Sequence, residues 1–241
     1  MTELIRDVAG KRWFPGCLPR ESEPGDGKFR IFDPDKAPLA RRGPDSLNWE
    51  VVKSLIFHII NQGNQGSCCA CMGAGIMMLV REIMGLARVI FSQASLYGQG
   101  NGGQDQGMAI DRCLQLLVDV GCCPISVIDQ YDWRGFRNNT WPVNWKTEAK
   151  KYRAAEVMDC PSLEVMQAAN EMGHPVAYGA KGHAVIRFFL DINSWGRSWG
   201  ENGCGIWATD RELIRAIPQY GAWVLLLAAD PIGDGDLPQP K

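Results

Sequence analysis

One long segment of the chain is apolar on every side. From Cys68 the sequence reads CCACMGAGIMMLVREIM, without a proline and without a polar residue before Arg81. A helix that is apolar all round is buried all round, and Gly63 and Gly66 mark a loop before it. Because glycines within the segment lower its helix propensity, we expect burial in a core to hold it helical.

Two further segments have the helical period. Residues 109–119 place apolar side chains three and four positions apart. Ser162 is placed to cap a second helix, which a glycine stops after Met172. Short apolar runs bounded by turn residues predict strands at 175–180, 183–190 and 223–229.

The pattern is less decisive in two places. Residues 49–60 end in the apolar, β-branched run Leu-Ile-Phe-His-Ile-Ile, and we expect a buried strand or an ordered lead-in segment there. Residues 129–147 are aromatic, polar and irregular, which is typical of a surface loop.

The two ends of the chain predict little regular structure. Residues 1–46 hold six of the fourteen prolines together with mixed charges, so we expect an extended arm. Residues 230–241 are rich in Pro, Gly and Asp, and we expect a disordered tail. The folded domain is then predicted over residues 47–229.

The composition is that of an ordinary globular protein. Of the 241 residues 46% are hydrophobic and 22% are charged, and the net charge of −2 indicates no basic surface for nucleic acid. The longest run free of charge and amide, Cys68–Val80, is too short to span a bilayer. The first residues lack the apolar stretch of a signal peptide. We therefore expect a cytoplasmic protein without membrane or nucleic-acid partners.

The chain contains nine cysteines, with Cys68, Cys69 and Cys71 close together. An odd number without an export signal argues against a disulfide framework. A thiolate zinc site is the alternative, but none of the three histidines lies at ligand spacing from a cysteine. We expect no metal or other cofactor, and we expect most of these thiols to pack as small buried hydrophobes.

Cys68 has the context of a nucleophile. It lies where a glycine-containing loop ends and the buried helix begins, and the free amides and dipole at a helix start favour a thiolate. Gln62 in the same loop offers a side-chain N–H that can meet the Cys68 backbone N–H at one oxyanion. A base and a group that orients this base must come from elsewhere in the chain.

The C-terminal half supplies a matching segment. His183 begins the run His-Ala-Val, and residues 193–203 read NSWGRSWGENG. Together with NQGNQGSCCA at residues 61–70 and Asn-Gly-Gly at 101–103, these motifs resemble the papain-like cysteine peptidases, in particular compact bacterial and bacteriophage-type members. The resemblance extends over residues 49–207.

This resemblance implies an α+β fold of two lobes. A helical lobe is expected at about residues 61–130 and an antiparallel, β-barrel-like lobe at about residues 150–229, with the active-site cleft between them. The implied activity is hydrolysis of peptide bonds in a peptide or protein substrate through a thioester acyl-enzyme. A bacterial cytoplasm, a phage-infected host or a virion is the implied setting.

The resemblance also implies a role for each matching residue. Cys68 is the nucleophile and forms a thiolate–imidazolium pair with His183, whose other ring N–H donates to the side-chain carbonyl of Asn193. Trp195 shields that hydrogen bond from water, and Gln62 completes the oxyanion hole. The implied substrate-binding residues are Gly66, Ser67, Gly102, Gly103 and Trp195.

A second register of the same motif stays open. If the second Asn-Gln-Gly is the matching one, Cys71 is the nucleophile and Gln65 the oxyanion donor. Cys68 is then half of a disulfide, for which a cysteine is expected where Gly100 stands. We favour Cys68, because that register keeps Gly-Ser before the nucleophile and Ala two residues after it.

Several features depart from the family pattern. Cys69 stands where larger members carry tryptophan, and only nine residues separate His183 from Asn193. The arm is shorter than the usual inhibitory propeptide, so we expect an active enzyme to be controlled by a partner, by its compartment or by timing. A Cys-His amidase or cell-wall peptide hydrolase, and an inactive peptide-binding module, therefore stay open as alternative functions.

Overall fold

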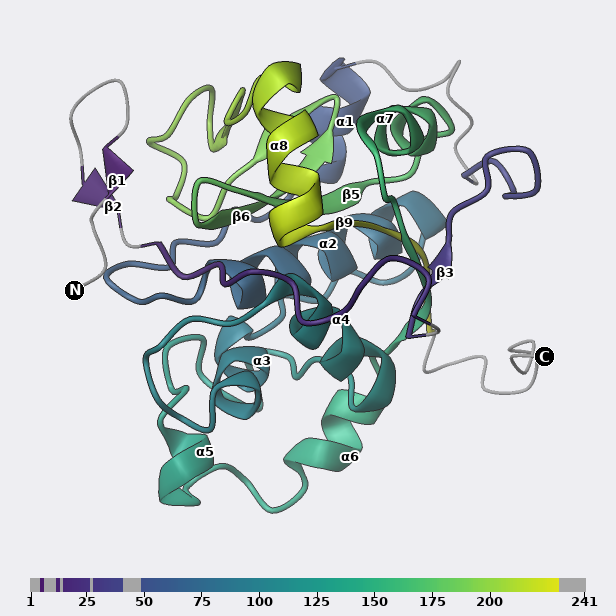
Figure 1. Cartoon of the computed structure of the whole chain (residues 1–241). Helices are drawn as coiled ribbons and strands as arrows, with labels where there is room; N and C mark the ends of the chain where they lie inside the picture. The colour runs from purple at the N-terminus through teal and green to yellow at the C-terminus, as the bar shows by residue number, and fades with distance from the viewer. Residues whose placement is uncertain (1–4, 7–11, 14, 27, 41–48, 230–241) are drawn as a thin grey trace.

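The computed structural model describes residues 5–6, 12–13, 15–26, 28–40 and 49–229; the predicted tail lies outside them. Figure 1 shows a lobe of helices and a lobe built on a sheet, with helix α2 (Cys68–Met84) between them. Both parts of the expected α+β architecture are present. Within the described residues, no helix has the length and apolar character that crossing a bilayer requires.

Helix α2 confirms the prediction of a buried helix. Nearly all of its side chains are buried, on the sheet side as well as on the side of the other helices. Gly73 shows why a glycine is needed inside it, since a Cβ there would lie 2.6 Å from the Cys113 sulfur. The glycines that lower helix propensity therefore allow close packing on both sides.

The sheet of the second lobe is mostly antiparallel. Its hydrogen-bonding order is β3-β4-β9-β5-β6-β7-β8, and only β3 pairs parallel with its neighbour. The strands in this order thus form an open sheet, and the three predicted strands are confirmed as β5, β6 and β9. The strands are β3 (Arg30–Ile31), β4 (Ala154–Asp159), β5 (Val176–Ala180), β6 (His183–Phe188), β7 (Leu190–Ile192), β8 (Cys204–Gly205) and β9 (Ala222–Ala228).

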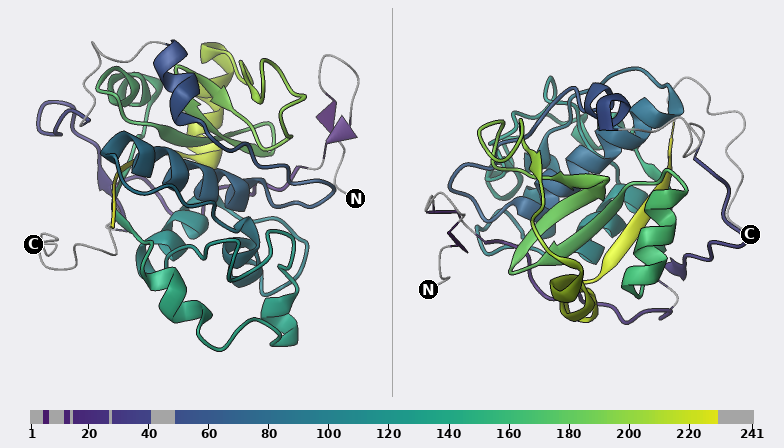
Figure 2. Two further views of the ribbon diagram at one scale, coloured as in Figure 1. Left: turned by 180° about the vertical axis from the view of Figure 1, so that it is seen from behind. Right: turned by 90° about the horizontal axis from the view of Figure 1, so that it is seen from above.

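Helices cover both faces of this sheet. Helix α2 packs on one face, and α7 (Leu163–Glu171) and α8 (Asp210–Tyr220) pack on the other, as Figure 2 shows from above. The Ser162 hydroxyl accepts from the Val165 backbone N–H, which confirms the predicted cap. Thr209 and Glu212 form a capping box at the start of α8, which the sequence reasoning missed.

The helical lobe packs against the opposite side of α2. Helix α4 (Ile110–Asp119) confirms the helix predicted at residues 109–119. The predicted loop at 129–147 is only partly correct, because it contains one helix and the start of another, and buries Trp133 and Trp141. The other helices of this lobe are α3 (Gln93–Gly100), α5 (Gly135–Asn138) and α6 (Trp145–Lys150).

Of the two expectations for residues 49–60, the strand is wrong, whereas residues 56–60 lie in neither helix nor strand, as the lead-in alternative expects. The first half of this segment is helix α1 (Trp49–Leu55), in which Val52 and Leu55 are buried three residues apart. Glu50 and Lys53 form an ion pair at the same helical spacing. The β-branched residues of this segment made the helical spacing hard to recognise in the sequence. The packing of one helix face against the core stabilises the helix.

The N-terminal arm is integrated into the fold. Its strands β1 (Ile5–Arg6) and β2 (Arg12–Trp13) pair with each other, and β3 extends the main sheet. Between β2 and β3 the extended chain crosses the front of the molecule, with α8 above it and α4 below it (Figure 1). Phe29 and Phe32 are buried in the two apolar cores.

Candidate active site

Cys68 is the first residue of helix α2. The preceding residue, Ser67, has a backbone conformation of φ −96° and ψ 16°, and within the described chain its side chain makes no capping hydrogen bond. Its hydroxyl lies instead 3.6 Å from the Cys71 sulfur. The first amides of an α-helix have no partner inside the helix, so the amides around Cys68 can meet an anion.

His183 is the first residue of β6 and follows a tight hairpin turn. The two residues of the turn, Lys181 and Gly182, have φ values of 55° and 72°, and Ala180 pairs with His183 across the strands. Two positive φ values in a two-residue loop are typical of the type I′ turn. The sheet and this turn therefore hold the imidazole at a defined place.

Asn193 fixes the imidazole. Its side-chain oxygen lies 2.8 Å from His183 Nε2 and also accepts the Ser194 backbone N–H at 2.7 Å. Because that oxygen only accepts hydrogen bonds, Nε2 carries the hydrogen. The other ring nitrogen, Nδ1, is buried without an oxygen or nitrogen partner among the described residues. In the neutral ring Nδ1 therefore carries no hydrogen and can accept one.

Two tryptophans enclose the same ring. Trp195 stacks on His183 with 4.3 Å between ring centroids and 24° between planes, and Trp207 meets it edge-on at 5.5 Å. His183 has no exposed surface and Asn193 is only 3% exposed. The tryptophans thus keep water from the hydrogen bond. Trp207 was missed in the sequence because it lies outside the recognised motifs.

The surroundings of Cys68 lower the pKa of its thiol. Burial opposes ionisation of this thiol, but hydrogen bonds from Cys69 and His183, the charge of His183 and a backbone hydrogen bond from Ala184 outweigh it. Together they hold the pKa of Cys68 well below its ordinary value of 9.0. The structure therefore brings together the predicted thiol, base and orienting amide.

Cys71 has a different environment. It lies one helical turn further along α2, and its thiol contacts Ser67 and Ser194. Burial raises the pKa of the Cys71 thiol far above its ordinary value, although both serines oppose this shift. Of the two thiols considered in the sequence, the one beside the imidazole is Cys68.

Gln62 is held in place by the sheet lobe. Its backbone N–H donates to the Ser194 carbonyl at 2.8 Å, and its side-chain oxygen accepts the Ser194 hydroxyl at 2.6 Å. Its side-chain nitrogen donates to the Gln65 carbonyl at 2.9 Å. These contacts orient the amide so that its nitrogen faces the loop before Cys68.

The predicted substrate-binding glycines lie in two different places. A Cβ on Gly66 would approach Asp105 and Gly107, whereas a Cβ on Gly103 would lie 2.5 Å from the Arg137 Cβ in α5. A Cβ on Gly102 would meet no other atom within 4 Å. In the loop after α3, the glycine beside Gly66 is therefore Gly107. The sequence signal for it would have been this additional glycine, which follows the Asn-Gly-Gly motif.

Side-chain hydrogen bonds tie the two loops together. The Asp105 carboxylate accepts the Gly66 backbone N–H at 2.9 Å and the Tyr97 hydroxyl at 2.5 Å. The Tyr97 oxygen in turn accepts the Gly107 backbone N–H at 3.1 Å. The loop before Cys68 is thereby fixed against the loop after α3.

The N-terminal arm passes directly over this region. The backbone N–H groups of Gly16 and Cys17 donate to the Gly182 carbonyl at 3.1 and 2.9 Å. The Met108 N–H donates to the Gly16 carbonyl at 2.9 Å, and the Leu18 N–H donates to the Met108 carbonyl at 3.1 Å. The arm thus bonds to both lobes, and neither Cys68 nor His183 has exposed surface.

No metal-binding cluster of His, Cys, Asp and Glu occurs among the described residues. All nine cysteines belong to that part of the chain, and each is buried as a free thiol.

Comparison with known proteins identifies the fold. No family model matches the chain, and no curated protein matches its sequence. Among solved structures it is similar to xylellain, a cysteine protease from Xylella fastidiosa, with 17% identity and a TM-score of 0.67 over 91% of this chain and 98% of that one. It is also similar to digestive procathepsin L 3 of Tenebrio molitor, with 16% identity and a TM-score of 0.61 over 85% and 75% of the two chains.

A third similar structure is the Carica candamarcensis cysteine protease CMS1MS2 in complex with E-64. Its identity is 17% and its TM-score is 0.55, over 76% of this chain and 97% of that one. These similarities agree with the resemblance seen in the sequence motifs and with the two-lobed architecture. The chain therefore has the fold of the papain-like cysteine proteases.

Proposed function

We propose that the protein is a cysteine peptidase that hydrolyses peptide bonds through Cys68, His183 and Asn193. The observation that carries this proposal is the 2.8 Å contact between His183 Nε2 and the Asn193 side-chain oxygen. It assigns the hydrogen to Nε2 and leaves Nδ1 as the base for the Cys68 thiol. The fold supports it as well, because the similar structures named above are cysteine proteases.

The first half of the reaction forms a thioester. His183 Nδ1 takes the Cys68 proton, and the thiolate attacks the carbonyl carbon of the substrate. The Cys68 backbone N–H and the Gln62 side-chain N–H donate to the resulting oxyanion. His183 then gives its Nδ1 proton to the departing amine as the carbon–nitrogen bond breaks.

The second half restores the enzyme. His183 Nδ1 takes a proton from a water molecule, whose oxygen attacks the thioester carbon. The carbon–sulfur bond breaks, the product carboxylate leaves, and Cys68 returns to its pair with His183. Asn193 holds the imidazole throughout, and Trp195 keeps solvent from the Nε2 hydrogen bond.

Selective alkylation of the full-length protein tests this proposal. We expect iodoacetamide near pH 6 to label Cys68 ahead of the other cysteines, as located by peptide mass spectrometry, since it alone among them has a strongly lowered thiol pKa in the described chain. Cys68→Ala should abolish both this labelling and cleavage of a casein substrate. Cys71→Ala is the matched control and should retain both.

Two results would contradict the proposal. One is labelling of Cys68 no faster than that of a denatured thiol, and the other is casein cleavage that survives in Cys68→Ala. Rapid labelling with cleavage of cell-wall peptides but not of casein would indicate the amidase alternative. The cytoplasmic location and the bacterial or phage setting stay predictions.

A further inference from the structure

Residues 16–18 of the arm lie between Met108 of the helical lobe and Gly182 of the sheet lobe, and we call this place the groove. Residues 16–18 pair in parallel with Met108 of the helical lobe and donate two hydrogen bonds to Gly182, which precedes His183. A Cβ on Gly16 would lie 1.9 Å from the Gly66 carbonyl oxygen, so the two backbones are in direct contact. The inference below rests on the proposed function, because it concerns access to Cys68.

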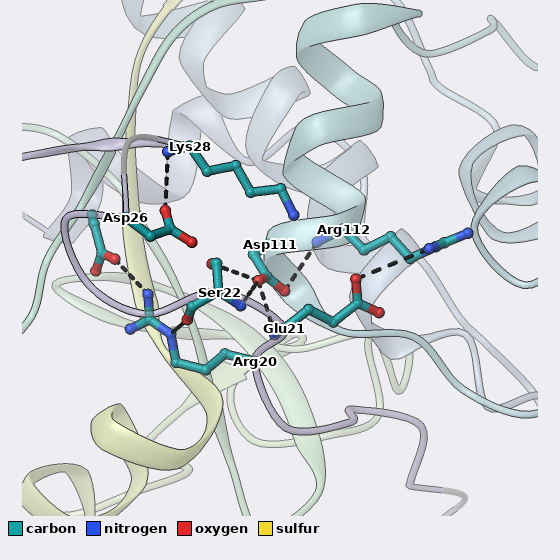
Figure 3. Close-up of polar contacts among 8 residues, drawn as sticks. Arg20, Glu21, Ser22, Asp26, Lys28, Asp111 and Arg112 are labelled. Atoms are coloured by element: carbon teal, nitrogen blue, oxygen red, sulfur yellow. Dashed lines mark hydrogen bonds and ion pairs between the residues drawn. The ribbon is translucent and has the colours of Figure 1, made fainter.

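Buried polar groups hold the next residues of the arm. The Asp111 carboxylate of α4 accepts the Glu21 and Ser22 backbone N–H groups at 2.9 and 2.8 Å and the Ser22 hydroxyl at 2.6 Å (Figure 3). Arg20 forms a 2.6 Å ion pair with Asp159 of β4, with side chains only 5% and 2% exposed. The arm is therefore docked by specific contacts to both lobes.

A thiol of the arm lies near the thiols at the start of α2. Cys17 is buried and pairs with Met108, and its thiol interacts electrostatically with the Cys69 thiol, which interacts in turn with the Cys68 thiol. Cys69 also donates to the Met108 carbonyl at 2.9 Å, the group that accepts the Leu18 N–H. Three thiols thus lie in sequence from the arm to the proposed nucleophile.

We propose that Cys17 and Cys69 are a redox-sensitive pair, and that a disulfide between them locks the arm over Cys68. In the reduced protein the arm can leave the groove and admit a substrate. In the oxidised protein the bond ties residue 17 to the residue next to the nucleophile, so the groove stays closed.

A low-molecular-weight disulfide such as oxidised glutathione is the oxidant. When the arm leaves, the Cys17 thiol loses its proton to solvent, and its thiolate attacks one sulfur of the small disulfide and displaces the other as a thiolate. While the arm is still open, Cys69 loses its proton to solvent and its thiolate attacks the Cys17 sulfur; the second small thiolate is displaced and takes a proton from solvent. Two protein thiols are oxidised to one disulfide, and one small disulfide is reduced to two thiols.

Thiol–disulfide exchange at Cys17 and Cys69 requires that the arm be open. Burial raises the pKa of Cys69, and its interactions with Cys17 and Cys68 raise it further. Burial also raises the pKa of Cys17. In the docked state both groups are protonated thiols that a small disulfide cannot reach. The rate of oxidation therefore depends on how often the arm opens.

The test uses full-length Cys68→Ala protein, so that no result depends on the nucleophile. The protein is incubated with oxidised glutathione, quenched in acid, alkylated and digested without reductant. We expect mass spectrometry to find a peptide joining Cys17 to Cys69. Cys17→Ser in this background should abolish it, whereas the matched control Cys160→Ser, a buried thiol of the sheet lobe, should leave it unchanged.

The lock itself is measured by hydrogen exchange on the same samples. The Leu18 and Met108 amides bond across the arm, and we expect their exchange to slow by about tenfold or more on oxidation and to recover with a dithiol. Cys17 and Cys69 found only as separate glutathione adducts would overturn the pair. A joined peptide with unchanged exchange would overturn the lock.

These outcomes are independent of peptidase activity. If the joined peptide and slowed exchange are found but wild-type protein cleaves no peptide, the proposed function fails and the thiol pair stands. If wild-type protein cleaves peptides and no Cys17–Cys69 bond forms, the thiol-pair proposal fails and the proposed function stands.

Discussion

The Asn193 side-chain oxygen accepts two hydrogen bonds at once, from His183 Nε2 at 2.8 Å and from the Ser194 backbone N–H at 2.7 Å. The backbone donor orients the amide, and the amide in turn selects the tautomer of the imidazole. A residue next in the chain thereby controls which ring nitrogen of His183 meets Cys68.

Replacing Asn193 should impair chemistry more than folding. We expect Asn193→Ala to lower kcat/KM by about a hundredfold or more, because His183 loses the acceptor that orients it. Assays of peptide hydrolysis measure the loss, and circular dichroism checks the fold. The exposed Asn138→Ala is the control, and equal activity in both variants would contradict the role of Asn193.

The pH dependence of Cys68 alkylation should report its lowered pKa. A thiol is reactive as the thiolate, so a lowered pKa keeps the alkylation rate high from pH 9.0 down to the folded pKa, and the rate falls below that. In His183→Ala the rate should fall already below about pH 9, since the stabilising charge and hydrogen bond are removed. The test is to measure the Cys68 alkylation rate of both proteins between pH 4 and 10. Superimposable pH profiles of wild type and His183→Ala would rule out the ion pair between Cys68 and His183.

Gly16→Ala should open the groove. Its Cβ would lie 1.9 Å from the Gly66 carbonyl oxygen, and overpacking of this kind typically costs about 1–3 kcal/mol. We therefore expect Cys68 to be alkylated roughly tenfold faster than in wild type under reducing conditions. Leu18→Ala changes an exposed side chain beside it and should have little effect. Unchanged labelling in Gly16→Ala would show that the arm does not limit access.

Asp111→Ala should release the next part of the arm. Three hydrogen bonds to this carboxylate are lost, and each bond to a charged group contributes about 1.5–3 kcal/mol. Limited proteolysis should then cleave residues 15–26 about tenfold faster or more. Glu21→Ala is the matched control, because only the backbone N–H of Glu21 bonds to Asp111. Similar cleavage rates in the two variants would contradict this anchoring role.

The sequence was sufficient where short-range chemistry decides the structure. Helix α2 was predictable because an apolar run without proline can satisfy its backbone only as a buried helix or strand, and its length favours the helix. The cap at Ser162 and the strand after Gly182 follow from local turn chemistry in the same way. The motif around Cys68 also placed a thiol at a helix start without any knowledge of the fold.

Helix α1 shows where local pattern was insufficient. Its segment contains β-branched residues in a run that is compatible with both states, and packing of Val52 and Leu55 against the core selects the helix. Similarly, Gly102 and Gly103 match a motif, yet the backbone beside Gly66 belongs to Gly107, because the Tyr97 and Asp105 hydrogen bonds set the path of the loop.

By itself, then, the sequence determined the buried helix, the hairpin that begins β6 and the residue types able to form a thiol–imidazole pair. Only the tertiary structure decided that Cys68 rather than Cys71 lies at His183, and that Cys17 lies against Cys69. The physical reason is chain separation. Local propensity acts over a few residues, whereas these contacts join residues 115 and 52 positions apart and exist only when both lobes have packed around α2.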